Sequence, residues 1–220
     1  MNRLLVSIFL ILSTACAPEY SGKESPPIVD GTIDLTGWDF EKDGPIKLRG
    51  EWRFAWEKFV EPAPWETLRE ELSYTAPVPG GFSAIAEPSM DDGFLPGTGY
   101  GTYGLRIIGL GTQALSVSGL TPAIASRMLL LSESAEVLSS FNAGTPAQAI
   151  DQEVGIHRGT VNLPIPEVPR EKRTVKDAEH IILIQMSSFA NPHGGIQSSF
   201  KLDTKSRNLA TQRILLHQRI

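Results

Sequence analysis

The chain has 220 residues, of which 41% are hydrophobic and 20% charged, and its formal net charge is −5. This is the composition of a globular domain, and it excludes a disordered or fibrous chain. The acidic balance argues against nucleic acid as a partner, because a nucleic-acid surface needs a basic face. The 20 glycines and 16 prolines indicate many turns and favour a β-rich fold.

The N-terminus is typical of an export signal. Residues 1–3 give a short positive start, residues 4–12 are apolar apart from one serine, and small residues follow at 13–15. The apolar run is too short to cross a bilayer as a helix, so we expect a signal peptide over residues 1–15.

The lone cysteine bears on where this signal is cleaved. LSTAC, which ends at Cys16, resembles a bacterial lipobox, in which cleavage before the cysteine leaves a lipid on its sulfur, whereas ACA around the same residue fits ordinary signal peptidase. A single thiol has no intramolecular disulfide partner, so we favour lipidation of Cys16. The polar, proline-rich segment 16–29 would then be a lipidated tether. The expected location is the cell envelope of a bacterium, at the outer membrane or its periplasmic face.

Period-2 patterns predict a series of strands between residues 30 and 203. Segment 46–56 alternates, and the near-continuous apolar run 180–187 is long enough for a buried central strand. Further strands are expected at 102–110, 114–120, 126–132, 135–141 and 197–203, with a hairpin about Glu133–Ser134. Many short strands separated by turns indicate an all-β fold, with two sheets packed as a sandwich.

Two segments predict helices. Pro62 and Pro64 interrupt the first, so a short helix is expected from Pro64 onward, with this proline near its first turn. The segment 204–220 has no helix breaker and predicts a C-terminal helix that leaves the domain. Its apolar residues are Leu209, Ile214, Leu215 and Leu216.

The stretch GEWRFAWEKF (50–59) allows two interpretations. Trp52, Phe54 and Trp56 alternate with other residues, so they form one face of a strand. That face either packs into the core or offers a platform on which a ligand stacks. Because large aromatic side chains contribute much of the buried area of a sandwich, we favour the core.

The sequence contains no motif typical of catalysis. It has no G-x-S-x-G element and no phosphate-loop or dinucleotide signature. The adjacent carboxylates at 70–71 and 91–92 are more typical of solvated charge than of an acid–base pair. The four histidines lack metal-ligand spacing. We therefore expect no enzyme and no metal ligands, and a structural calcium ion near Asp91 and Asp92 stays open.

Aromatic and amide side chains in loops give the candidate ligand site. Trp38 and Trp65 stand beside turn residues, so each can stack on the apolar face of a sugar or pack under a loop. In SSFANPHGGIQ, Asn191 can contact a ligand or cap its own backbone. We expect one site at the loop end of the sandwich, made by Trp38, Trp65, Tyr100, Asn191 and His193.

Four segments, taken in order, resemble a known family. They are IDLTGWDFEKDGPIKLRGEWRFAW (33–56), VPGGF (78–82), GYGTYGLRI (99–107) and ILIQMSSFANPHGGI (182–196). This set is similar to the extracellular sensor domain of bacterial seven-transmembrane receptors with diverse intracellular signalling modules. The layout is also similar to the N-terminal sugar-binding domain of family 2 glycosidases.

The resemblance implies a jelly-roll sandwich of galactose-binding-like type over residues 30–203, with Trp52, Tyr103 and Gly195 as scaffold. It implies a non-catalytic sensor of carbohydrate or another small ligand, linked to signal transduction through a membrane partner. The resembled receptors continue into seven membrane helices, so a free-standing sensor lipoprotein and a piece of a receptor are both open. The alternative function is a structural or interaction lipoprotein that docks a membrane partner through 204–220 and binds no small ligand.

Overall fold

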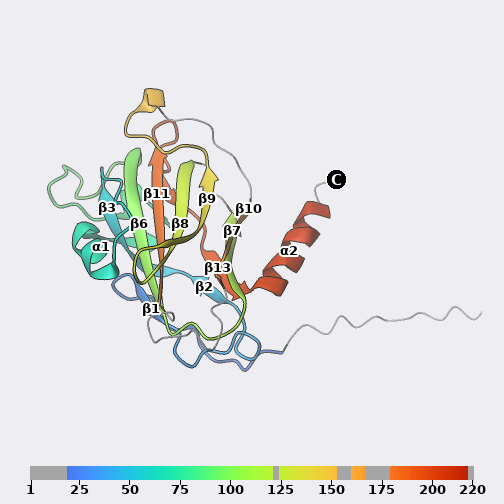
Figure 1. Cartoon of the computed structure of the whole chain (residues 1–220). Helices are drawn as coiled ribbons and strands as arrows, with labels where there is room; N and C mark the ends of the chain where they lie inside the picture. Colours follow the sequence, from blue (N-terminus) through green and yellow to red (C-terminus); the bar gives the residue numbers. More distant parts are fainter. Residues whose placement is uncertain (1–18, 121–123, 153–159, 167–178, 218–220) are drawn as a thin grey trace, which may run out of the picture.

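The computed structural model describes residues 19–120, 124–152, 160–166 and 179–217. Within these residues the fold is an all-β jelly-roll sandwich with a short helix and a C-terminal helix, as the sequence predicts (Figure 1). The large sheet has the strand order β4-β3-β6-β11-β8-β9, and β1 joins it through a parallel pairing with β6. Its strands are β1 (Thr32–Asp34), β3 (Gly50–Trp56), β4 (Tyr74–Val78), β6 (Gly99–Ile108), β8 (Ala125–Ser132), β9 (Val137–Ala143) and β11 (His180–Ser188).

The small sheet has the order β10-β7-β13-β2 and packs on the large one. Its strands are β2 (Ile46–Leu48), β7 (Leu115–Leu120), β10 (Thr160–Pro164) and β13 (Phe200–Thr204), and β5 (Gly80–Gly81) pairs with β12 (Gly195–Ile196) as a separate ribbon. The helical elements are α1 (Trp65–Glu71), α2 (Lys205–His217) and the short 3₁₀ turns η1 (Phe82–Ala84) and η2 (Ile150–Gln152).

The main core lies between the two sheets and answers the question raised by GEWRFAWEKF. Trp52 and Phe54 are fully buried there, and the ring of Trp52 lies 6.3 Å from that of Phe200 on the small sheet. Tyr103 on the neighbouring strand is also fully buried, with its ring 4.5 Å from that of Phe54. The alternating aromatics therefore form a core face, as predicted.

A second apolar cluster covers the outer face of the large sheet. Residues of β8 and β11 point away from the main core here, and α1 packs against the same face through Trp65, Leu68 and the adjoining Leu72. The strand members are Ala55, Leu129, Leu131, Ile181 and Leu183, and all are buried. The central strand β11 is thus buried on both faces, which explains its near-continuous apolar sequence.

The predicted strand over 46–56 is two strands in two different sheets. β2 pairs with β13 in the small sheet, whereas β3 pairs with β4 and β6 in the large one. The chain crosses between them at Gly50, whose φ is +143°. This conformation favours glycine, and the alternation of side chains continues through it, which hides the crossing from a pattern search.

The expected tether is packed on the domain over much of its length. Ser21 donates its backbone N–H to the Lys42 carbonyl at 2.8 Å, and Ile28 is 5% exposed within the main core. The packed domain therefore begins before residue 30. Residues 1–18, with the predicted signal and Cys16, lie outside the described part of the chain.

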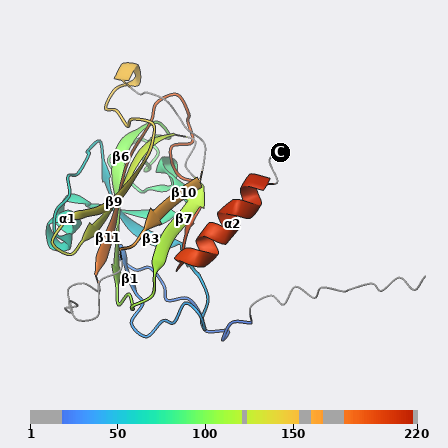
Figure 2. The ribbon, with the colours of Figure 1, turned by 45° about the vertical axis from the view of Figure 1, so that its right-hand side comes forward.

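Helix α2 begins beside β13 and runs away from the sandwich (Figures 1 and 2). Its start is fixed by Asn208, which is 1% exposed and donates to the backbone oxygen of Ser116 at 2.8 Å. No helix in the described ranges is long and apolar enough to cross a membrane.

Candidate functional site

The structure separates the five predicted ligand residues into three places. Tyr100 is the second residue of β6. Trp38 follows β1, and β1 pairs with the opposite end of β6, where Asp34 lies beside Ile108. Trp65 begins α1 on the outer face of the large sheet. The prediction that all five share the loop end is therefore wrong for the two tryptophans.

Trp38 is a packing residue at the end that holds the N-terminal segment. It is 6% exposed, and its indole Nε1 donates to the Gly44 carbonyl at 3.0 Å. The Lys23 ammonium lies 5.1 Å from the ring centroid and covers it. A ring held in this way has no free face for a sugar, because the turn residues beside it fold over it.

Trp65 is also covered. It is 4% exposed in the outer cluster, and a Cβ placed on Gly104 of β6 would lie 3.6 Å from its ring. Its helix is held against the sheet by Asp30, which pairs with Arg53 at 2.5 Å and with Arg69 of α1 at 2.7 Å. Trp65 therefore fixes α1 to the sheet.

Tyr100, Asn191 and His193 do lie at one end of the sandwich. Tyr100 pairs with Ser187 across β6 and β11, and the loop that follows β11 carries the other two. Asn191 is half-buried, and its Oδ1 accepts the His193 backbone N–H at 3.0 Å, so the self-capping alternative holds for this oxygen. The His193 side chain is exposed.

Two residues that the sequence analysis missed complete this end. The ring of Tyr100 lies 5.0 Å from that of Phe59 and 6.3 Å from that of Phe189, and all three side chains are half-buried. Tyr100 lies in β6, and Phe59 and Phe189 lie in the segments that follow β3 and β11, the two neighbours of β6 in the large sheet. We call Phe59, Tyr100 and Phe189 the aromatic strip. Neither phenylalanine belongs to an alternating pattern, so only the strand order brings them together.

Buried hydrogen bonds fix the segment that carries Phe59. The Thr102 hydroxyl donates to the Lys58 carbonyl at 2.7 Å and accepts the Val60 backbone N–H at 3.0 Å. The Gln185 amide donates to the Val60 carbonyl at 3.0 Å. Both side chains are buried, so the bonds fix the backbone on either side of Phe59 before any ligand arrives.

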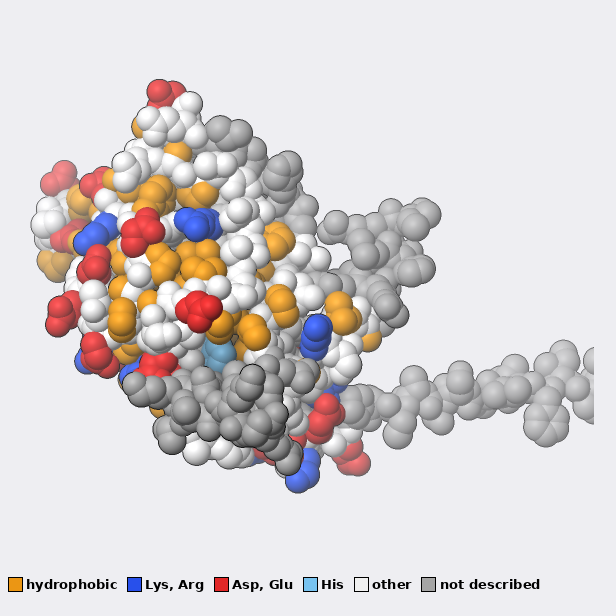
Figure 3. All heavy atoms as spheres, viewed as in Figure 1, with side chains coloured by type: hydrophobic (Ala, Val, Ile, Leu, Met, Phe, Trp, Pro, Cys, Tyr) orange, Lys and Arg blue, Asp and Glu red, His pale blue; other side chains and the backbone are white. Residues whose placement is uncertain are grey.

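Polar and charged groups surround this face without forming a metal cluster. Figure 3 shows hydrophobic side chains gathered over the large sheet, with charged side chains among and around them. The described residues include no group of three or more His, Cys, Asp or Glu that could hold a metal ion. Asp92 accepts the Phe94 backbone N–H at 3.2 Å, so it caps its own loop, and the calcium suggestion has no ligand cluster there.

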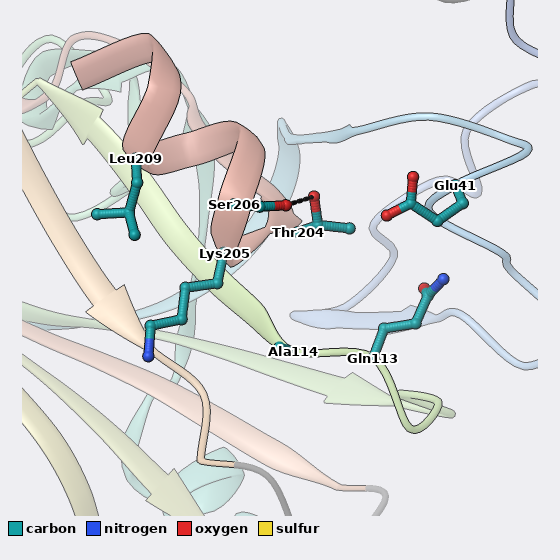
Figure 4. Close-up of a pocket in the computed structure, with 7 residues that line it drawn as sticks. All are labelled: Glu41, Gln113, Ala114, Thr204, Lys205, Ser206 and Leu209. Carbon is teal, nitrogen blue, oxygen red and sulfur yellow. Dashed lines mark hydrogen bonds between the residues drawn. The ribbon is translucent and has the colours of Figure 1, made fainter. Parts of the chain in front are cut away.

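A hollow of about 490 Å³ lies elsewhere, at the start of α2 (Figure 4). Its lining residues are Glu41, Gln113, Ala114, Thr204, Lys205, Ser206 and Leu209. Two of the polar groups facing it are already engaged: Gln113 accepts the Phe40 backbone N–H, and Glu41 pairs with Arg207 at 3.2 Å. This hollow does not include the aromatic strip.

Comparison with known proteins gives only weak structural likenesses. No family model matches the chain, and no curated protein matches its sequence. A β-glucuronidase structure from Ruminococcus gnavus aligns at 13% identity and a TM-score of 0.39. The alignment covers 72% of this chain and 27% of the glucuronidase chain. The same enzyme in complex with D-glucaro 1,5-lactone gives 14% identity, a TM-score of 0.40 and 28% of its own length. The chain spans under a third of the length of these enzymes, and TM-scores this low carry no argument about it.

Proposed function

We propose that this chain is a non-catalytic, extracytoplasmic domain that binds carbohydrate at the aromatic strip. The observation that supports the proposal is the row of half-buried rings of Phe59, Tyr100 and Phe189 at one end of the sheet. Aromatic rings present apolar faces to the C–H faces of sugars, and the backbone that carries Phe59 is already fixed by the bonds of Thr102 and Gln185, which lowers the entropy cost of binding.

Hydrogen-bonding groups beside the strip suit the hydroxyls of a sugar. The Asn191 Oδ1 is used within its loop, but its amide nitrogen makes no hydrogen bond within the described part of the chain. The exposed imidazole of His193 follows two residues later. A row of rings with an amide and an imidazole at its edge is a small number of polar groups around an apolar platform, as in many ligand sites.

A binding role is favoured over hydrolysis at this end. The acids nearest the strip in sequence, Glu57 and Glu61, are both exposed. Glycosidases instead hold two carboxyl groups at a set separation on either side of the scissile bond. With the predicted export signal and lipidated Cys16, the domain would sense a sugar in the cell envelope and pass the signal to a membrane partner.

The test is a thermal-shift screen of the purified chain against mono- and oligosaccharides, with and without calcium. A ligand that binds only the folded state raises the melting temperature in a concentration-dependent way. We expect Tyr100→Ala to abolish such a rise. The matched control is Tyr20→Ala, a half-buried tyrosine packed beside Gly44 at the end where Trp38 lies. A flat screen on a folded protein, or an equal loss in both variants, contradicts the proposal.

The second candidate function is docking of a membrane partner through α2. The observation that favours it is the course of this helix away from the sandwich, with Leu209 at 40% exposure (Figure 2). Crosslinking in native membranes tests it: a partner captured by the wild type and lost on deletion of 204–220 supports docking, and an unchanged capture contradicts it.

A further inference from the structure

Strand pairing places an arginine on the same face as the aromatic strip. Thr102 pairs with Gln185, Gln185 with Arg127, and Arg127 with Asn142, in one row across β6, β11, β8 and β9. Directly paired residues point to the same face of a sheet, and so do residues two apart along a strand. Tyr100, two residues before Thr102, therefore shares its face with Arg127.

Arg127 differs from the other cations of this face. Arg53 pairs with Asp30, Lys58 with Glu71 at 2.8 Å, and Arg106 with Glu179 at 2.6 Å. The Arg127 side chain is exposed and makes no ion pair or hydrogen bond with the described residues. The uncompensated guanidinium is available to an anion, and its planar fork matches a carboxylate or sulfate in two parallel hydrogen bonds.

The surroundings of Arg127 suit a saccharide more than a free anion. Directly opposite on β9 stands Asn142, an exposed amide that makes no hydrogen bond in the described ranges. On the other side, Gln185 is turned to Val60 and does not compete for the guanidinium. An amide beside a guanidinium offers donors and an acceptor to ring hydroxyls next to the charged group.

The spacing from Arg127 to the strip fits a chain of sugars. β8 is two strands from β6, about 10 Å, and Arg127 lies one row of the pleat below Tyr100, about 7 Å along the strands. Two segments lie over the β11 residues between them: the Val60 carbonyl accepts from Gln185 at 3.0 Å, and the Ala147 backbone N–H donates to the Ser187 hydroxyl at 3.0 Å, so a chain of sugars would pass over both. Resting on the proposed function, we infer that the ligand is an acidic oligosaccharide, with sugar rings on the aromatic strip and its anionic group on Arg127.

The experiment measures the affinity of the purified chain for acidic oligosaccharides and their neutral counterparts by titration calorimetry. One pair is trigalacturonic acid and its methyl ester, and the other is sialyllactose and its methyl ester; each ester keeps the rings and removes the charge. We expect at least one acidic member to bind about tenfold or more tightly than its neutral counterpart, as a charge-assisted hydrogen bond would give. Arg127→Gln should remove this preference.

The matched control is Lys47→Gln, which removes from β2 of the small sheet an exposed cation without an ion pair to any described residue, and it should leave the preference intact. The inference is overturned if the neutral members bind as tightly as the acidic ones, or if the preference survives Arg127→Gln. In either case the proposed function still stands if Tyr100→Ala weakens binding. No binding of any member, with a flat saccharide screen, overturns both.

Discussion

A Cβ placed on Gly50 would lie 2.9 Å from the Cβ of Ile28, because residue 28 crosses directly beside the bend that carries the chain from β2 to β3. The same glycine has a φ of +143°, which side chains rarely adopt. We expect Gly50→Ala to lower the free energy of unfolding by about 2 kcal/mol, since strain and a steric clash act together. Urea unfolding of the purified chain measures this.

The control for this substitution is Gly111→Ala. A Cβ added at Gly111 would meet open space, and the residue has no unusual φ. The free energy of unfolding of this variant should therefore differ from that of the wild type by less than about 0.5 kcal/mol. Equal midpoints for the two variants would show that the crossing from the small sheet to the large one tolerates a side chain.

Much of the fold follows from local pattern, and the hairpin of β8 and β9 is an example. Its strands read as short apolar alternations, and the turn lies at Ser132–Glu136, where the Glu133–Ser134 prediction put it. The central place of β11 also follows from its sequence, because a strand buried on both faces has no polar face to show.

The candidate site follows from sequence only in part, because burial by distant segments leaves no local signal. Trp38 and Trp65 stand beside turn residues, but a lysine and a seven-residue helix cover their rings. Phe59 and Phe189 carry no periodic signal and meet Tyr100 only through the order of the strands. Which residues are neighbours depends on topology, and period alone does not set topology.

Substitution of Trp65 separates a packing role from a ligand contact. Trp65→Ala removes a 4%-exposed indole from the outer cluster, and we expect it to lower the free energy of unfolding by about 3–5 kcal/mol. The affinity of the remaining folded protein for any saccharide found by the screen should be unchanged. Denaturant unfolding and titration calorimetry on the same sample measure both quantities, and a loss of affinity without a loss of stability would return Trp65 to the site.

Glu87 gives the domain a pH dependence on the acid side. Hydroxyl groups of Ser89 and Tyr74 donate to its carboxylate at 2.6 and 2.5 Å, and these bonds lower the pKa of Glu87 from 4.5 to about 2. A carboxyl group with a depressed folded-state pKa contributes stability above its ordinary pKa, and that stability is lost as the pH falls through the folded value. The wild type should therefore lose stability between about pH 4.5 and 2.

Glu87→Gln tests this contribution, because glutamine keeps the shape of the side chain and does not titrate in that window. The variant should lose less stability than the wild type between pH 5 and pH 2, measured by melting temperature across that range. Glu70→Gln, at an exposed acid of α1 without an ion pair among the described residues, is the control and should follow the wild type. Parallel curves for all three proteins would count against the two hydroxyl bonds.

Asn208 decides whether α2 stays fixed to the sandwich. Its amide nitrogen donates to the backbone oxygen and hydroxyl of Ser116 at 2.8 and 2.9 Å, and its oxygen accepts the Ser118 hydroxyl at 2.8 Å. Asn208→Ala removes all three bonds and leaves the buried Ser116 hydroxyl without this partner. We therefore expect the free energy of unfolding to fall by about 2–3 kcal/mol.

Hydrogen exchange of the α2 amides is the direct measurement, because local release of the helix speeds exchange there before the sheets open. Thr211→Ala, which removes an exposed hydroxyl that bonds, among the described residues, to the Arg207 carbonyl of the same helix alone, should leave exchange at the start of α2 unchanged. If Asn208→Ala frees the helix and also abolishes capture of a membrane partner, docking needs a fixed α2. If capture persists with a freed helix, the partner recognises the helix itself and its anchoring serves stability alone.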